Sequence, residues 1–317
     1  MARPGSSSDG GFELHEARYA ASTVKRYKAA VGDFVRWLAA TGEDCDSVSE
    51  LDALVDRYVH ILYRRDRSRS PQAAVCLRYG LTMLLPELKR LGLPRADLAI
   101  AGWRKMRPGK SYPPLPYVAA VATAAWLVAA GEFRAGVAVL LGFECYLRAG
   151  ELMSLQREGV GFPEQARARG AIKEPCVWLP KTKTGRDQSV SVRDPAVQRL
   201  LRVLVKETGR GEPLFPYSPQ RLRTLFQQAC NDLGIGGCGF VLHSLRHGGA
   251  TRDYCSGDLK LEDVMVRGRW ESSKTVRRYI QRGRALLLAN AIPEEMGDLV
   301  SRLERRGLDK ALLELRC

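Results

Sequence analysis

Apolar residues recur at helical spacing along most of the first hundred residues. Between Ser22 and Leu38 they fall three or four positions apart, with basic residues largely between them, which predicts an amphipathic helix. Ser22 is the predicted N-cap, because its hydroxyl can accept a hydrogen bond from a free N–H of the first helical turn. Helical pattern also covers residues 51–63 and 71–91. This part of the chain is therefore predicted to be a small all-helical domain.

A chain of 317 residues is long enough for two domains, and its pattern changes in one segment. Between Gly92 and Pro116, prolines and glycines interrupt a basic stretch, which is therefore not expected to hold a continuous helix. We interpret residues 107–116 as an interdomain linker. The predicted domains are residues 1–106, of which 1–12 are expected to be disordered, and residues 117–317.

The second predicted domain is mainly helical and contains one β segment. Two apolar helices follow the linker, and the first, over residues 117–131, is too short and alanine-rich to cross a bilayer. In the β segment, residues 177–179 and 189–192 flank the polar sequence TKTGRD, which predicts a hairpin. Helical pattern then continues to the end of the chain, with Gly307 separating two short stretches of the tail. The predicted fold is mainly α with a small β-sheet (α+β).

The charge of the chain points to a polyanionic partner. Lys and Arg total 50 against 35 Asp and Glu, a formal charge of +15, and both the first 110 residues and the remainder are basic. Nucleic acid is favoured over a membrane surface, because no lysine-rich amphipathic helix or lipidation motif accompanies the charge. The candidate DNA-contacting residues of the N-terminal half are Lys25, Arg26, Lys28, Arg64, Arg65, Arg67, Arg69, Arg104, Lys105 and Arg107.

The cysteines and the first residues bear on the cellular compartment. The eight cysteines are scattered, without the CxxC pairs or Cys/His clusters that bind zinc, so we expect reduced thiols and no metal site. The first eleven residues lack the apolar stretch of a signal peptide. We therefore expect an intracellular, DNA-associated protein that is not secreted.

Five separated elements carry candidate chemistry, although each has an ordinary explanation when taken alone. An arginine three residues before a glutamate usually forms a surface ion pair, a lysine in a polar turn is usually exposed, and a tryptophan belongs by default to a core. A histidine and an arginine three residues apart share one face at the start of a helix. In chain order the elements are Arg148 with Glu151, Lys183, His243 with Arg246, Trp270, and Tyr279.

In this order and at these intervals, the five elements resemble the tyrosine recombinase, or phage-integrase, family. Its signature order is Arg, Lys, His-x-x-Arg, His or Trp, and Tyr. Residues 148–151 look like the first arginine box of the family and residues 243–247 like the second. Trp270 stands where histidine is commoner, as in Cre-like members. Cys145 and Tyr146 depart from the family, since small residues are usual there. The helical N-terminal part resembles the SAM-like core-binding domain of the family, which is followed by a catalytic domain.

The resemblance implies a site-specific recombinase or integrase that breaks and rejoins DNA through a 3′-phosphotyrosine at Tyr279. Arg148 and Arg246 would bind the phosphate oxygens, because a guanidinium is a permanently charged planar fork. His243 is the candidate general acid/base, since imidazole titrates near neutrality and an ordinary phenol, with a pKa of about 10, needs assistance.

The remaining roles implied by the resemblance concern the leaving group and the supporting residues. Lys183 would protonate the departing 5′ oxygen, with Lys181 in the same turn as the alternative lysine. Trp270 can donate its indole N–H to a phosphate oxygen. Glu151 would orient an arginine or His243, and His247 is interpreted as structural.

Further expectations concern cofactors, partners and rival functions. A phosphotyrosine conserves the bond energy, so neither metal, ATP nor a small-molecule cofactor is expected. The expected partner is double-stranded DNA, bound by a homotetramer on two sites, with no membrane. The tail from Ile292 onward either closes its own domain or docks onto a neighbouring subunit. The alternative functions are a catalytically silent DNA-binding protein derived from a recombinase, and a type IB topoisomerase or telomere resolvase.

Overall fold

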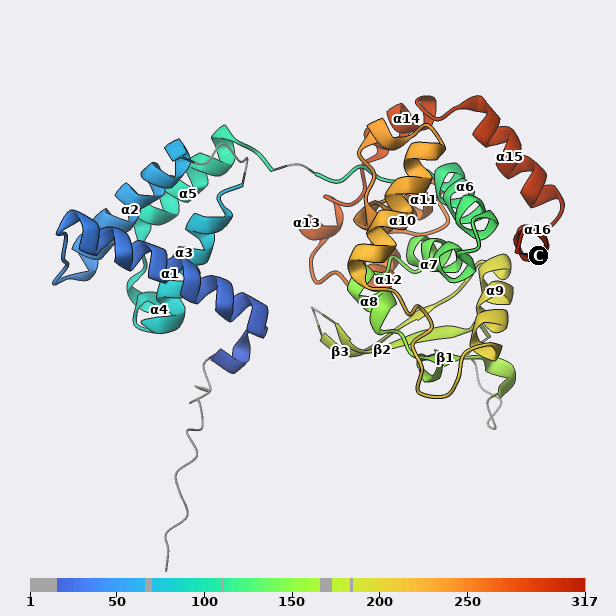
Figure 1. Ribbon diagram of the computed structural model, residues 1–317, viewed down its shortest axis with the longest axis horizontal. Helices are drawn as coiled ribbons and strands as arrows, with labels where there is room; N and C mark the ends of the chain where they lie inside the picture. Colours follow the sequence, from blue (N-terminus) through green and yellow to red (C-terminus); the bar gives the residue numbers. More distant parts are fainter. Residues whose placement is uncertain (1–15, 66–69, 110, 166–172, 183–184, 317) are drawn as a thin grey trace, which may run out of the picture. The chain divides into compact units, whose positions relative to one another are not determined.

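The computed structural model of the chain describes residues 16–65, 70–109, 111–165, 173–182 and 185–316. The chain divides into two compact units (Figure 1), which we call unit 1, Met1–Ser111, and unit 2, Tyr112–Cys317. The division falls inside the segment interpreted as a linker. The domain limits and the role of the linker remain predictions, and residues 1–12 lie outside the described residues.

Unit 1 is built from helices around one apolar core. Phe34, Val55, Leu77 and Trp103, each from a different helix, are among the buried residues of that core. Burial of such side chains stabilises the unit by about 1.5–3 kcal/mol for each large aliphatic or aromatic residue. The helices of its described part are α1 (Ala21–Thr41), α2 (Val48–Arg65), α3 (Gln72–Leu84), α4 (Leu88–Leu91) and α5 (Pro94–Met106).

Helix α5 contradicts the prediction that residues 92–116 hold no continuous helix. Pro94 lies at the first helical position, where its missing N–H breaks no intrahelical hydrogen bond. Gly102 costs the helix about 1 kcal/mol relative to alanine, but burial of Ile100 and Trp103 outweighs that cost. Pro94 therefore marks the start of a helix and Gly102 weakens it, but neither residue prevents the helix from forming.

Two boundaries in unit 1 also differ from the prediction. Helix α1 begins at Ala21, with Ala20 as a cap residue that makes no side-chain hydrogen bond, so Ser22 is already helical and cannot be the N-cap. The helical pattern over 71–91 is two helices, because the chain breaks at residues 85–87, around Pro86.

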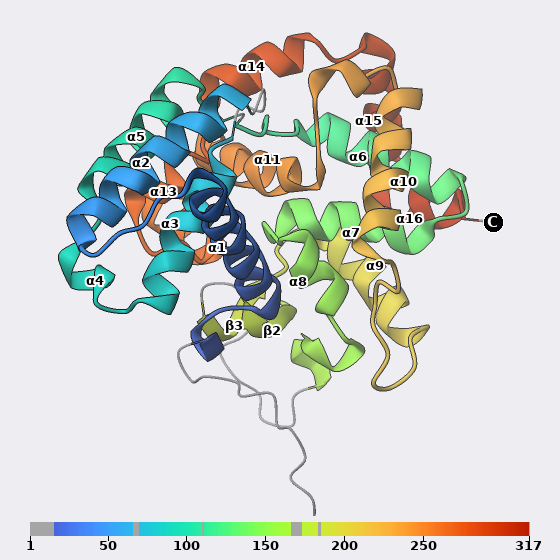
Figure 2. The same ribbon diagram turned by 60° about the vertical axis from the view of Figure 1, so that its left-hand side comes forward.

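Unit 2 is centred on two apolar helices, α6 (Tyr117–Ala129) and α7 (Phe133–Glu144). Helices α10 and α15 contact α6, while α9 and α11 contact α7 (Figures 1 and 2). The other helices of unit 2 are α8 (Ala149–Ser154), α9 (Pro195–Lys206), α10 (Pro219–Asp232), α11 (Leu242–Cys255), α12 (Leu261–Gly268), α13 (Ser273–Val276), α14 (Arg282–Asn290), α15 (Glu294–Arg305) and α16 (Leu308–Glu314). The expected buried helix after the linker is confirmed as α6. No helix in the described ranges has the length and apolar character needed to cross a membrane.

A small antiparallel sheet lies beside these helices, in the order β1 (Val160–Gly161), β2 (Cys176–Thr182) and β3 (Gly185–Ser191). The predicted hairpin is confirmed, although its strands are longer than expected. Lys181 pairs with Arg186 and Thr182 with Gly185, so Arg186 belongs to β3 and not to the turn. Strand β1 was not predicted. The mainly helical fold class with a small sheet is confirmed.

The C-terminal tail packs on its own unit. Leu308 and Leu312 of α16 are buried in the core of unit 2. Arg199 of α9 donates two hydrogen bonds to Asp309, at 2.6 and 2.8 Å. In this single chain the tail therefore packs on its own domain, and docking onto a neighbouring subunit stays a prediction.

Close approach of α11 to α7 depends on a glycine. A Cβ added to Gly249 would lie 2.0 Å from the backbone oxygen of Phe143 and 2.8 Å from the Tyr146 ring. Because a backbone carbonyl inside a packed unit cannot move aside cheaply, we expect Gly249→Ala to lower the free energy of unfolding by about 2–4 kcal/mol. Urea unfolding followed by tryptophan fluorescence measures this change.

The matched control is Gly297→Ala in helix α15, where an added Cβ would have nothing within 4 Å. This substitution should be neutral or stabilise by up to about 1 kcal/mol, because alanine has the higher helix propensity. Equal midpoints for Gly249→Ala and the wild type would show that α11 and α7 are not packed as described.

Candidate active site

The structure brings together the candidate residues of α8, α11 and the segment that follows α12. The guanidinium carbon of Arg246 lies 4.3 Å from the ring centre of Trp270 and 5.5 Å from that of Tyr279. The ring of His243 lies 5.6 Å from the ring of Tyr279, centre to centre. His243 and Arg246, more than thirty positions before Tyr279 in the sequence, thus lie close to it.

The predicted lysine is the exception. Lys183 lies outside the described residues, and Lys181 is described only as a backbone position in β2. The choice between the two lysines therefore stays a prediction.

Arg246 is the most deeply placed cation of the site. Its side chain is fully buried, and it donates hydrogen bonds to the backbone oxygens of Tyr146 and Gly268. Its Nε is buried without a hydrogen-bond partner among the described residues. Burial and the positive charges of Arg148 and Arg269 lower the pKa of Arg246. An anion bound nearby would offset the cost of burying this charge.

The backbone carbonyl of Tyr146 helps to hold Arg246 in place. Its backbone is left-handed, with φ of 50°, and this turns its carbonyl toward the guanidinium. Its hydroxyl donates a 2.5 Å hydrogen bond to Asp253, which also accepts a 3.0 Å hydrogen bond from Arg252. Burial and Asp253 raise the pKa of Tyr146, so this phenol remains a neutral donor. Tyr146, one of the two residues that depart from the pattern described above, thus has a structural role, which the sequence did not reveal.

Glu151 links two arginines at the start of α8. Its carboxylate accepts hydrogen bonds from the Arg148 backbone N–H at 2.9 Å and from the Arg148 guanidinium at 2.5 Å. Arg269 donates a further hydrogen bond to it at 2.7 Å. Burial raises the pKa of Glu151, but the two cations outweigh burial and the pKa is lowered overall. Arg269 was not among the predicted site residues, and in the sequence only its position directly before Trp270 points to it.

Tyr279 is half-buried among aromatic rings. Its ring stacks on His247 at 4.4 Å and lies 4.6 Å from the Trp270 ring, centre to centre. Its backbone carbonyl accepts a 3.1 Å hydrogen bond from the Thr251 hydroxyl and lies 3.4 Å from Nδ1 of His247. These contacts hold the tyrosine through its ring and backbone, and none of them uses its phenol oxygen.

The ring of Trp270 packs against the guanidinium of Arg246. It is buried, and its indole Nε1 has no hydrogen-bond partner within the described part of the chain. A Cβ added to Gly268 would lie 1.8 Å from the indole ring, so only glycine fits there. A buried N–H without a partner is costly, and a ligand oxygen would satisfy it.

His247 is neutral in the folded protein, because burial, followed by the nearby His243, lowers its pKa to about 4. The unfolded chain, with a histidine pKa of about 6.5, binds this proton more readily. Stability from this residue is therefore complete above pH 6.5 and is lost as the pH falls toward 4. Between pH 7 and 4.5, we expect the wild type to lose about 2 kcal/mol more free energy of unfolding than His247→Gln. Urea titrations at the two pH values test this, and equal losses would contradict a neutral, buried His247.

Several solved structures are similar to this chain in their fold. A lambda integrase dimer bound to a COC′ core site matches with a TM-score of 0.53 and 12% identity, over 83% of this chain and 73% of that one. A lambda integrase(75-356) dimer bound to a COC′ core site matches with a TM-score of 0.54 and 13% identity, over 85% and 92%. The XerA recombinase matches with a TM-score of 0.43 and 16% identity, over 93% and 95%. No protein-family model and no curated protein sequence matches the chain. The two lambda integrase structures show that the chain has an integrase fold.

Proposed function

We propose that this chain is a tyrosine recombinase that breaks and rejoins double-stranded DNA at specific sites through a 3′-phosphotyrosine at Tyr279. The observation that carries the proposal is the convergence of Tyr279 with His243 and with the buried guanidinium of Arg246. The integrase fold, in which these residues follow the order of that family, supports it.

The charge of the site suits a phosphodiester. Arg148 and Arg269 both pair with the carboxylate of Glu151, and their positive charges lower the pKa of the nearby Arg246 in addition to the effect of burial. Attack on a phosphodiester adds negative charge to the non-bridging oxygens. Guanidinium groups that are already held in place stabilise that charge without reorganising. The indole N–H of Trp270, which has no partner among the residues that the structure describes, is a further donor for the same oxygens.

The proposed reaction is a transfer of the phosphoryl group between two oxygens. The phenol oxygen of Tyr279 attacks phosphorus, the bond from phosphorus to the 5′ oxygen breaks, and the phenol proton passes to His243. The departing 5′ oxygen takes a proton from Lys183 or, alternatively, Lys181. Attack by another 5′ hydroxyl reverses these steps and rejoins the strands. The reaction therefore needs no external energy source.

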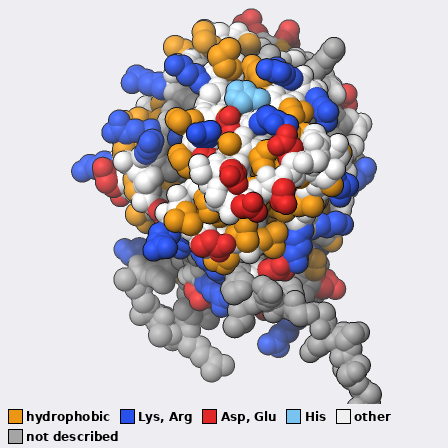
Figure 3. Space-filling model, turned by 90° about the vertical axis from the view of Figure 1, so that its left-hand side faces the viewer, with side chains coloured by type: hydrophobic (Ala, Val, Ile, Leu, Met, Phe, Trp, Pro, Cys, Tyr) orange, Lys and Arg blue, Asp and Glu red, His pale blue; other side chains and the backbone are white. Residues whose placement is uncertain are grey.

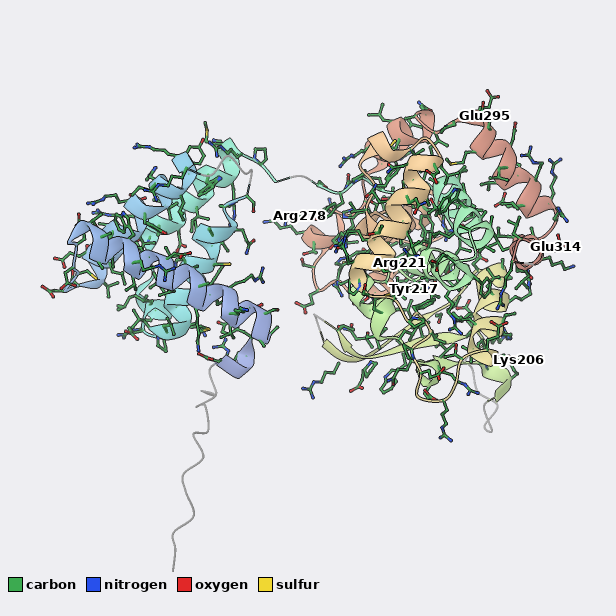
Figure 4. The ribbon with its side chains drawn as sticks, in the orientation of Figure 1. Lys206, Tyr217, Arg221, Arg278, Glu295 and Glu314 are labelled. Atoms are coloured by element: carbon green, nitrogen blue, oxygen red, sulfur yellow. The ribbon has the colours of Figure 1, made fainter. Side chains whose placement is uncertain are left out.

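Exposed basic residues of unit 1 suit DNA phosphates. Lys25, Arg26, Lys28, Arg64, Arg65, Arg104 and Lys105 are exposed, Arg107 is partly exposed, and Arg67 and Arg69 lie outside the described residues. On the face that Figure 3 shows, basic side chains are mixed with acidic and hydrophobic ones. Arg278, next to Tyr279, is exposed and points away from the body of unit 2 (Figure 4). We assign to these residues contacts with the backbone of DNA, which weaken with salt.

Strand exchange between two DNA sites would need four copies of the chain, one for each strand cut. The lambda integrase structures are dimers on a core site, which supports a DNA-bound oligomer. A homotetramer on two sites is the assembly proposed for this chain.

The proposal is tested by trapping the covalent intermediate. A pool of nicked duplexes with randomised sequence is incubated with the protein, and adducts that resist sodium dodecyl sulfate are isolated. We expect mass spectrometry to find a nucleotide 3′-phosphate on the peptide that contains Tyr279, and sequencing of the trapped ends to define the target site. The absence of an adduct, together with site-selective binding, would establish the silent DNA-binding alternative. Relaxation of supercoiled plasmid by a monomer without site preference would establish the topoisomerase.

A further inference from the structure

Arg269 occupies a backbone position that favours glycine. It caps the end of α12 with φ of 58° and ψ of 44°, in the left-handed region, where a residue with a Cβ costs about 1 kcal/mol or more. Its side chain is nonetheless 96% buried, since only 4% of it is exposed. A strained backbone and a buried charge both lower the stability of the fold. Strain of this kind is concentrated at functional sites, which directs attention to the contacts of the guanidinium.

The contacts of Arg269 are directed at Glu151. Nη2 of Arg269 lies 2.7 Å from Oε2 of Glu151, while Oε1 accepts the 2.5 Å hydrogen bond from Arg148. Nη1 makes only a long, 3.4 Å hydrogen bond to the backbone oxygen of Arg267, and Nε is buried without a partner in the described part of the chain. Glu151 is therefore a carboxylate shared between two arginines.

The pairing of Glu151 with a second arginine affects how much positive charge Arg148 keeps. If Glu151 were paired with Arg148 alone, the single negative charge would neutralise that arginine. With Arg269 on the opposite oxygen, the carboxylate still orients Arg148 through two hydrogen bonds, but its charge is divided between two cations. Arg148 then keeps positive charge for an anion that binds at the site.

We propose that Arg269 is a further positioning residue of this site, which holds Glu151 and thereby sets both the orientation and the effective charge of Arg148 toward a DNA phosphate. The inference rests on the proposed recombinase function. It assigns to Arg269 an action through Glu151 and not a contact with the scissile phosphate.

The test compares adduct formation in a single turnover by the wild type, Arg269→Gly, Arg269→Lys, Glu151→Gln and the double variant Glu151→Gln/Arg269→Gly. Arg269→Gly relieves the left-handed backbone but removes one cationic partner of the buried Glu151, so its unfolding temperature is measured first and the rates are compared below it. There the adduct should slow by about 10- to 100-fold. Arg269→Lys keeps the charge and should recover part of the rate. The double variant should be no slower than the slower single variant, because the two residues act as a unit.

The matched control is Arg210→Gly, which removes an arginine from an exposed turn of the same unit and should keep the wild-type rate. A wild-type rate for Arg269→Gly would overturn the inference. Rate losses that multiply in the double variant would also overturn it, because Arg269 would then act independently of Glu151.

A second measurement separates this inference from the proposed function. Inorganic phosphate should raise the unfolding temperature of the wild type and of Arg210→Gly, and raise that of Arg269→Gly less. If the wild type binds phosphate in this way but forms no adduct, the recombinase function fails while the positioning role stands. If phosphate stabilises the wild type and Arg269→Gly equally, or stabilises neither, the positioning role fails.

Discussion

Tyr279→Phe is expected to abolish the covalent adduct with DNA while leaving the fold intact. The substitution removes one oxygen and keeps the ring, which lies against His247 and Trp270. The backbone carbonyl of Tyr279 accepts the hydrogen bond from the Thr251 hydroxyl and faces Nδ1 of His247, and phenylalanine retains that carbonyl. Adduct formation should fall at least about a thousandfold, because no other group can replace a nucleophile. Gel electrophoresis after denaturation measures the loss.

The control is Tyr254→Phe, which makes the same chemical change at an exposed tyrosine of helix α11. It should form the adduct at the wild-type rate, and both variants should unfold at the wild-type temperature. Undiminished adduct from Tyr279→Phe would move the nucleophile to another residue and remove the central element of the proposed function.

The fold could be predicted from the sequence wherever burial imposes a period on the chain. Helix α6 is buried on nearly every face, and its apolar run identifies it. The hairpin of β2 and β3 follows from two short strands around a polar turn. Composition was a poorer guide at α5, because Pro94 and Gly102 interrupt the pattern while tertiary burial of Ile100 and Trp103 forms the helix all the same.

The type and order of residues along the chain were enough to predict which residues are candidates for the site, but not the contacts between them. The sequence offered Arg148, His243, Arg246, Trp270 and Tyr279 as candidates, and the structure brings these side chains close together, with Glu151 beside Arg148. The contacts between distant residues had no indication in the pattern. Arg269 lies 118 positions from Glu151, and Tyr146 lies 107 positions from Asp253. Such supporting pairs depend on how α8, α11 and α12 pack, which no local rule describes.

Arg246→Lys is expected to reduce adduct formation by about a hundred- to a thousandfold, the range for removing one preorganised donor at a developing negative charge. The guanidinium of Arg246 is a planar fork that reaches the carbonyls of Tyr146 and Gly268 while its carbon lies over the Trp270 ring. A lysine ammonium is a single point of charge on a flexible stem and cannot hold both carbonyls and the same position over the ring. Single-turnover trapping measures the rate.

The same substitution should also destabilise unit 2, which distinguishes it from Tyr279→Phe. One buried carbonyl left without a donor costs about 1–3 kcal/mol, and this loss should appear in urea unfolding. The control is Arg221→Lys on α10, where the exposed guanidinium pairs with Glu132 at 2.7 Å beside Tyr217 (Figure 4). There a lysine can keep the ion pair, so rate and stability should change little. If Arg246→Lys retained the wild-type rate, the buried guanidinium would serve the fold alone, and the phosphate would have to be bound by Arg148 without it.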